Sequence, residues 1–151
     1  MQVLDTAFAE IHPKILYFGT PVVLLSTRNE DGSPNLAPMS SCWTLGWTAV
    51  LGLTLVGKTI ENLQRERECV LECPLQMEAR LRQVWEMSDP KLRAIGGAAT
   101  VAVSVVRVHA RRDIVIGDCY VDPARWKPLI YNFRHYFGLG EELGRTFRAE
   151  I

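Results

Sequence analysis

Residues 35–63 of this 151-residue chain read NLAPMSSCWTLGWTAVLGLTLVGKTIENL. This stretch gives the clearest indication of the fold. The apolar run from Trp47 to Leu55 is too short for a membrane helix and predicts a buried strand. The segment from Ile60 to Glu66 has apolar residues three positions apart, which predicts a short helix. Thr59 is the expected N-cap, because its hydroxyl can accept a hydrogen bond from the Asn62 amide. The stretch therefore predicts a strand that leads directly into a helix.

Apolar and β-branched runs on both sides of this stretch predict further strands. Asp31-Gly32 supplies the positive φ that a hairpin requires, so a strand is expected to begin again near Asn35. Many short strands, frequent turns and few helices predict a mainly β fold, a closed antiparallel barrel. The expected strands are Val22–Thr27, Cys69–Leu71, Gln76–Val84, Thr100–His109 (with Val101, Val103 and Val105 inward against Ala102 and Ser104) and Ile114–Ile116.

Length and charge limit the possible classes of protein. At 151 residues the chain is expected to be a single domain, residues 1–151, with a real core. Its 17 basic side chains are balanced by 17 acidic ones. Because this leaves no net field to attract polyanions, we expect no nucleic-acid partner and no membrane partner.

The first ten residues carry acidic side chains and lack both a basic start and a long apolar run. We therefore expect a cytoplasmic protein without a signal peptide. In that compartment the four cysteines are expected to be thiols. Cys69 and Cys73 form a C-x3-C pair with neither a second pair nor a nearby histidine, so we assign no metal site.

Two features of residues 35–62 suit a phosphorylated aromatic ligand. The start of the predicted helix offers unpaired amides and the positive end of the helix dipole, and Lys58 and Thr59 lie there. The polar turn before the strand offers hydroxyls and amides to a flat ring. Flavin mononucleotide (FMN) combines a flat ring with a terminal phosphate. Without further context, however, Lys58 is more readily explained as a solvated turn lysine and Thr59 as a simple cap.

The candidate ring contacts are Met39, Ser40, Ser41 and Cys42, whose hydroxyls and amides can hydrogen-bond the pyrimidine edge of a flavin. The alternative is an ordinary serine-rich strand end. Asn35 suits contact with ribityl oxygens and capping of the turn equally well.

Aromatic residues give weaker signals. Trp43 and Trp47 can flank a ring, although tryptophans of a small barrel are more often core residues. His135 lies among aromatic residues of the tail and can approach a flavin or a nicotinamide phosphate, but such a histidine is more often a packing residue. The segment from Asp122 to Tyr131 is expected to be irregular or briefly helical, and the aromatic tail after it must be covered by something.

Several motifs in a fixed order resemble the flavin reductase-like family of FMN-binding split barrels, and within it the flavoredoxin-like branch. The motifs that carry this resemblance are Gly19–Val22, Asn29–Gly32, Asn35–Ser41, Lys58-Thr59-x-x-Asn62-Leu63, Glu68–Val70 and Trp126–Leu129 through Tyr136–Gly140.

The resemblance implies a six-stranded antiparallel Greek-key split barrel. It also implies a homodimer with FMN near the subunit boundary and electron transfer from NAD(P)H or a protein donor. It favours Lys58 and Thr59 as phosphate contacts and adds Asn62 to the cofactor site. The acceptor it implies is free flavin, a ferric chelate or a disulfide.

One departure from the family pattern bears on activity. Members of the branch carry a longer segment between the strand after the Lys-Thr helix and the strand that resembles Glu72–Ala79. Here residues 68–71 run almost directly into that strand. Such a segment can form part of a flavin cover, so a non-catalytic FMN or haem carrier is the alternative function. In a third reading, the tail from Trp126 to Phe137 binds a partner chain.

Overall fold

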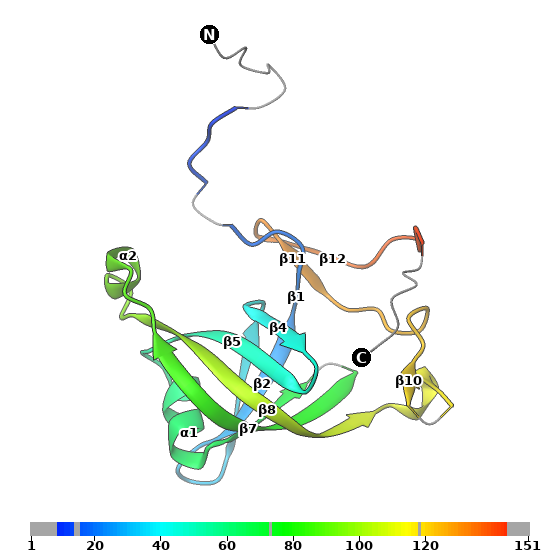
Figure 1. Cartoon of the computed structure of the whole chain (residues 1–151), viewed down its shortest axis with the longest axis horizontal. Helices are drawn as coiled ribbons and strands as arrows, with labels where there is room; N and C mark the ends of the chain where they lie inside the picture. Colours follow the sequence, from blue (N-terminus) through cyan, green and yellow to red (C-terminus); the bar gives the residue numbers. More distant parts are fainter. Residues whose placement is uncertain (1–8, 14–15, 73, 118, 145–151) are drawn as a thin grey trace.

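The computed structural model describes residues 9–13, 16–72, 74–117 and 119–144 (Figure 1). Its main feature is a seven-stranded antiparallel sheet with the order β3-β2-β6-β7-β8-β5-β4. The strands of this sheet are β2 (Val23–Arg28), β3 (Pro34–Met39), β4 (Cys42–Leu45), β5 (Thr48–Thr54), β6 (Glu68–Glu72), β7 (Leu75–Glu86) and β8 (Ala98–Ala110).

The sheet closes on itself because its two edge strands are neighbours in sequence. Only Ser40 and Ser41 separate the end of β3 from the start of β4. Consecutive Cα atoms lie about 3.8 Å apart, so the two edges must meet at this point and the sheet must curl. Strands β3 and β4 act as one strand broken at the two serines, which reconciles seven strands with the six expected. The predicted mainly β split barrel is confirmed.

The core lies inside this curled sheet. Alternate residues of each strand point inward, and the side chains of Leu25, Leu51, Leu71, Val101 and Val103 are completely buried. The predicted inward positions of β8 are correct. Ala102 is also buried, contrary to the expected alternation, and it lies where the pairing with β7 changes register between Leu81 and Gln83.

Helix α1 (Lys58–Glu66) covers one end of the barrel through Ile60 and Leu63, which join the core (Figure 1). The predicted N-cap is wrong. The helix begins two residues earlier than expected, after Gly57, and no side chain caps it. The Thr59 hydroxyl instead accepts a hydrogen bond from Asn35. The hydroxyl that the sequence predicts as a helix cap therefore forms a tertiary hydrogen bond instead.

Smaller elements surround the barrel. Residues Thr20–Pro21 (β1) pair with a hairpin of β11 (Ile130–Asn132) and β12 (His135–Phe137) in a separate three-stranded sheet. The irregular or helical structure expected up to Tyr131 is therefore wrong at β11. Pairing with β1, far away in sequence, makes this segment a strand. The remaining elements are α2 (Pro90–Arg93), the 3-10 turn η1 (Arg112–Ile114), β9 (Val115–Ile116) and β10 (Tyr120–Val121).

Within the described part of the chain, no helix is both long and apolar enough to cross a membrane. Residues 1–8, on which the signal-peptide expectation partly rests, and Cys73 lie outside the described residues.

Candidate functional site

The start of helix α1 carries Lys58 between two carboxylates. Its Nζ atom lies 3.6 Å from Oε1 of Glu30, in the β2–β3 turn, and 3.3 Å from Oε2 of Glu61, in the same helix. The Lys58 side chain is 44% exposed, so both ion pairs are screened by solvent. An incoming anion can therefore exchange with either carboxylate at little cost.

Asn35 connects β3 to this helix start. Its Nδ2 atom donates hydrogen bonds to the hydroxyls of Thr27 and Thr59, both at 3.1 Å. The turn-capping role considered for Asn35 is not seen, because the β2–β3 turn is closed by other residues, while its contact with ribityl oxygens stays a prediction. Asp31 accepts from the Ser33 amide, and the Asn29 and Ser33 backbones pair with each other. Asn35 fixes the position of β3 against α1.

Asn62 belongs to the same polar network and is completely buried. Its Nδ2 donates to Oδ1 of Asn29 at 2.8 Å and to the Thr27 hydroxyl at 3.4 Å. Its own Oδ1 atom is buried and has no hydrogen-bond partner in the structure. Leaving a buried acceptor unpaired costs about 1–3 kcal/mol, so this amide oxygen is suited to a donor that enters the network.

The four predicted ring contacts lie together at the break between β3 and β4. Met39 and Cys42 are half-buried and pack against the core, and the two serines between them are also half-buried. The Ser41 carbonyl accepts a hydrogen bond from the Gly52 amide at 2.8 Å. The Ser41 hydroxyl forms a hydrogen bond with the Tyr17 hydroxyl at 2.9 Å. The serine-rich turn thus holds polar groups in fixed positions.

Strand β3 links the two halves of the predicted site. Asn35 at its start contacts Thr59 of α1, and its last residue, Met39, is followed by the serine pair. A strand rises by about 3.3 Å per residue, so Asn35 and Ser41 are about 20 Å apart along the chain. A ligand that touches both ends of β3 must be elongated.

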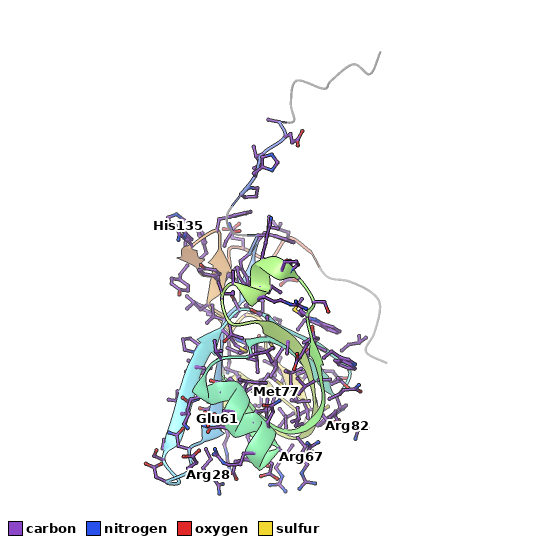
Figure 2. The ribbon with its side chains drawn as sticks, turned by 90° about the vertical axis from the view of Figure 1, so that its left-hand side faces the viewer. Arg28, Glu61, Arg67, Met77, Arg82 and His135 are labelled. Atoms are coloured by element: carbon purple, nitrogen blue, oxygen red, sulfur yellow. The ribbon has the colours of Figure 1, made fainter. Side chains whose placement is uncertain are left out.

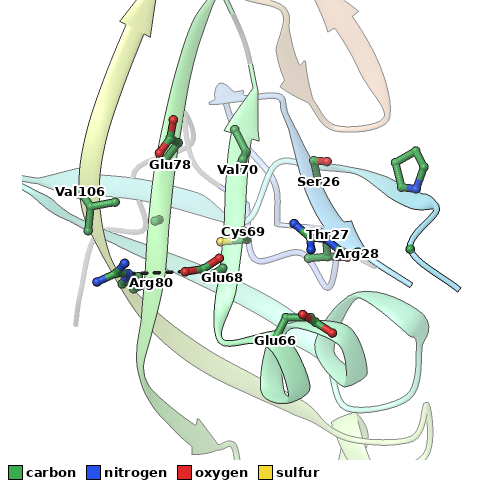
Figure 3. Close-up of a pocket in the computed structure, with 13 residues that line it drawn as sticks. Ser26, Thr27, Arg28, Glu66, Glu68, Cys69, Val70, Glu78, Arg80 and Val106 are labelled. Atoms are coloured by element: carbon green, nitrogen blue, oxygen red, sulfur yellow. Dashed lines mark ion pairs between the residues drawn. The ribbon is translucent and has the colours of Figure 1, made fainter. Parts of the chain in front are cut away.

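A separate cavity of about 370 Å³ lies over β2, β6 and β7 (Figure 3). Its walls include the ion pair between Glu68 and Arg80, whose Oε1 and Nε atoms are 3.6 Å apart, beside Val70 and Val106. The eight predicted cofactor residues are not part of its lining. The cavity is large enough for a small ligand, but it does not coincide with the site derived from the sequence.

The aromatic candidates lie on the surface. Trp43 and Trp47 are 58% and 63% exposed, so the expectation that they belong to the core is wrong for the single chain. The reason is that Trp43 lies opposite Val50 on the outer face of the sheet, and Trp47 lies in the turn that joins β4 to β5. His135 is exposed on β12, at the opposite end of the molecule from Glu61 on α1 (Figure 2). It is thus distant from the predicted phosphate contacts.

Cys69 of β6 is buried and belongs to the core. Burial raises the pKa of the Cys69 thiol to about 12, so it is neutral at physiological pH. Among the described residues, no three His, Cys, Asp or Glu side chains lie close enough together to hold a metal ion.

Sequence reasoning missed four residues that the fold brings to the site. Thr27 and Asn29 complete the network around Asn62, and Tyr17 and Gly52 contact Ser41. Their partners lie between 8 and 35 positions away in sequence, so local patterns carry little signal for them. The Asn29–Gly32 motif indicates a turn and carries part of the family resemblance, but it does not assign Asn29 to the site.

The chain matches no family model. It is 34% identical, over 201 aligned positions, to the uncharacterized protein YdfE of Bacillus subtilis, and the alignment covers 95% of each protein. The chain belongs to the same family as YdfE. The alignment has 201 positions but this chain has only 151 residues, so the sequence of this YdfE family member carries gaps in the alignment. YdfE therefore has residues without a counterpart here.

Solved structures define the fold of this YdfE family member. Flavoredoxin from Methanosarcina acetivorans superimposes with a TM-score of 0.79 at 13% identity and covers 93% of this chain and 96% of its own. Component B of nitrilotriacetate monooxygenase from Bacillus cereus gives 0.78 at 13% identity, covering 93% and 100%. A proposed flavin reductase with a split-barrel domain from Shewanella frigidimarina gives 0.68 at 16% identity, covering 86% of both chains. The predicted flavin reductase-like split-barrel fold is confirmed.

Proposed function

We propose that this protein is a flavoprotein oxidoreductase that binds FMN along strand β3. The observation that carries the proposal is the placement of two different polar sites at the two ends of one strand. Asn35 meets the first turn of α1 at one end, and Ser40 and Ser41 break the strand at the other. FMN has the matching shape, with a phosphate at one end and a flat ring at the other. The names of the solved neighbours point to the same cofactor class.

The phosphate end of FMN fits the start of α1. Gly57 is the N-cap and has no side chain, so no side chain occupies the amides of the first turn. These amides, the Thr59 hydroxyl and Lys58 would hold the phosphate. The buried Oδ1 of Asn62 offers an acceptor to a hydroxyl donor close to the same helix. Glu30 and Glu61 must release Lys58 for this, which their exposure permits.

The ring end of FMN fits the break between β3 and β4. Backbone amides and hydroxyls from Met39 to Cys42 would orient the pyrimidine edge and stabilise negative charge there. When bound, FMN supplies the hydride and electron transfer chemistry, and the protein contributes orientation and polarity. The donor in this proposal is NADH, NADPH or a protein, and the acceptor is free flavin, a ferric chelate or a disulfide.

A homodimer in the cytoplasm is part of the proposal. Trp43 and Leu45 of β4 and Trp47 of the following turn are exposed, and together they offer an apolar surface suited to a second copy. Light scattering after size exclusion tests the dimer, and a monomer would contradict it.

The test of the cofactor is the visible absorption spectrum of the purified protein, with the released chromophore identified by mass. Oxidised-flavin bands and released FMN are expected. A colourless protein that takes up no added FMN would overturn the proposal. Mixing the FMN-loaded protein with NADH or NADPH without oxygen then tests the electron donor, and rapid loss of the flavin absorbance supports a reductase.

A carrier that holds FMN or haem without its own nicotinamide reaction is the second candidate. The alignment with YdfE favours this carrier function, because the YdfE residues that have no counterpart in this chain can include part of an acceptor pocket. Stable FMN binding combined with no reduction by either nicotinamide would identify the carrier.

A further inference from the structure

Two residues, Gly52 and Tyr17, hold Ser41 in place. The Ser41 carbonyl accepts a hydrogen bond from the Gly52 amide, and the Ser41 hydroxyl forms a hydrogen bond with the Tyr17 hydroxyl. A Cβ atom added at Gly52 would lie only 3.0 Å from the Ser41 Cβ, so glycine allows the two backbones to approach closely. An ordinary strand-end serine needs none of these restraints.

Tyr17 is itself held by the C-terminal hairpin. Its carbonyl accepts a hydrogen bond from the Phe133 amide at 2.8 Å. Its ring meets the Tyr131 ring edge to face, with centroids 5.6 Å apart, and Tyr131 lies 5.4 Å from Tyr136. The β11–β12 hairpin thus fixes the Tyr17 ring, and Tyr17 in turn fixes the Ser41 side chain.

The two hydroxyls have one proton more than their mutual hydrogen bond uses. Each hydroxyl carries one proton and can also accept. Whichever of the two donates, one O–H group remains available to a third atom. At the break between β3 and β4, that group is available to the ring edge of a bound ligand.

We propose that Tyr17 is a positioning residue for Ser41, and that the hydroxyl pair presents one hydrogen-bond donor to the pyrimidine edge of the flavin. This inference rests on the proposed function, because it assumes a flavin at the serine turn. It assigns the aromatic tail a role in shaping that site. A donor at this edge stabilises the charge of the reduced ring, so the pair also raises the midpoint potential of the bound flavin.

The test compares wild type with Tyr17→Phe, Ser41→Ala and the double variant. Phenylalanine retains the ring packing of Tyr17 and removes only the hydroxyl. Each single variant is expected to weaken FMN binding by about two- to tenfold, the value of one hydrogen bond, and to lower the flavin midpoint potential. If the two residues act as a unit, the double variant binds no more weakly than Ser41→Ala.

Tyr136→Phe is the matched control, since it removes the same group from the same cluster without contacting Ser41. It should leave affinity and potential unchanged. Equal effects of Tyr136→Phe and Tyr17→Phe would overturn the inference, and so would independent, multiplying effects of Tyr17→Phe and Ser41→Ala.

The ligand-free protein provides a readout that does not depend on flavin. The amide NMR signals of Ser41 and Gly52 should shift in Tyr17→Phe and stay in place in Tyr136→Phe. Unmoved signals would overturn the positioning of Ser41 even if FMN binds. If those signals move but wild type binds no FMN, the proposed function and the donor role at the ring both fail, while the positioning of Ser41 stands.

Discussion

The Asn35 side chain donates a 3.1 Å hydrogen bond to the Thr59 hydroxyl, so the first residues of β3 are attached to the first turn of α1. This contact occupies the hydroxyl that would otherwise cap the helix. It leaves the amides of that turn without a side-chain cap, and Gly57 provides none. The helix start is therefore held by a neighbouring strand and remains open to an anion.

Replacing Lys58 tests that anion site. Lys58→Ala should weaken FMN binding by about ten- to a hundredfold, because it removes a charge-assisted hydrogen bond to the phosphate. Arg65→Ala is the control, since Arg65 also pairs with Glu30 but lies in the last turn of α1. Titration of flavin fluorescence measures both affinities. Unchanged affinity in Lys58→Ala would remove this lysine from the site.

Replacing Asn62 tests the buried polar network. Asn62→Ala should lower the free energy of unfolding by about 1–3 kcal/mol, because Asn29 and Thr27 lose a buried partner. Urea denaturation measures the change. Gln64→Ala, at an exposed position of the same helix, should alter stability far less. Equal losses in the two variants would mean that the network contributes nothing beyond helix propensity.

Thiol labelling tests the burial of Cys69. Its raised pKa, about 12, predicts that it resists alkylation near pH 8, while exposed Cys119 reacts. Peptide mass mapping after iodoacetamide treatment distinguishes the two. Labelling in denaturant should then modify both. Rapid modification of Cys69 in the folded protein would show that the barrel opens on the timescale of labelling.

The pair of His109 and Glu78 predicts a pH effect. The His109 ring nitrogen lies 2.8 Å from the Glu78 carboxylate, and this hydrogen bond is the main cause that lowers the pKa of Glu78 below its usual value of 4.5. A lowered carboxyl pKa stabilises the fold above the unfolded value, and the gain is lost as pH falls through the folded pKa.

In His109→Ala the pKa of Glu78 should therefore rise toward its usual value, as measured by carbon NMR titration. His12→Ala replaces an exposed histidine near Glu10 and should not affect Glu78. An unchanged Glu78 pKa in His109→Ala would show that Arg107, the other partner of this carboxylate, determines it.

Sequence alone was enough to predict most strands of the barrel, a helix that ends at Glu66 and the inward valines of β8. These features depend on the alternation of apolar residues and on turn chemistry, which act between near neighbours in the chain. The same local signals indicated Met39–Cys42 and Lys58–Thr59 as two candidate groups, and the family resemblance added Asn62. The order of several such motifs was sufficient to indicate the split-barrel fold.

Which side chains meet depends on the tertiary structure. Thr59 was expected to cap its own helix, but it bonds to Asn35 because β3 lies against α1. The segment before Tyr131 was expected to be irregular, but it forms β11 because β1, more than 100 residues earlier, pairs with it. Tyr17 reaches Ser41 in the same way. Such contacts depend on how the whole sheet curls, and no window of local sequence encodes that closure.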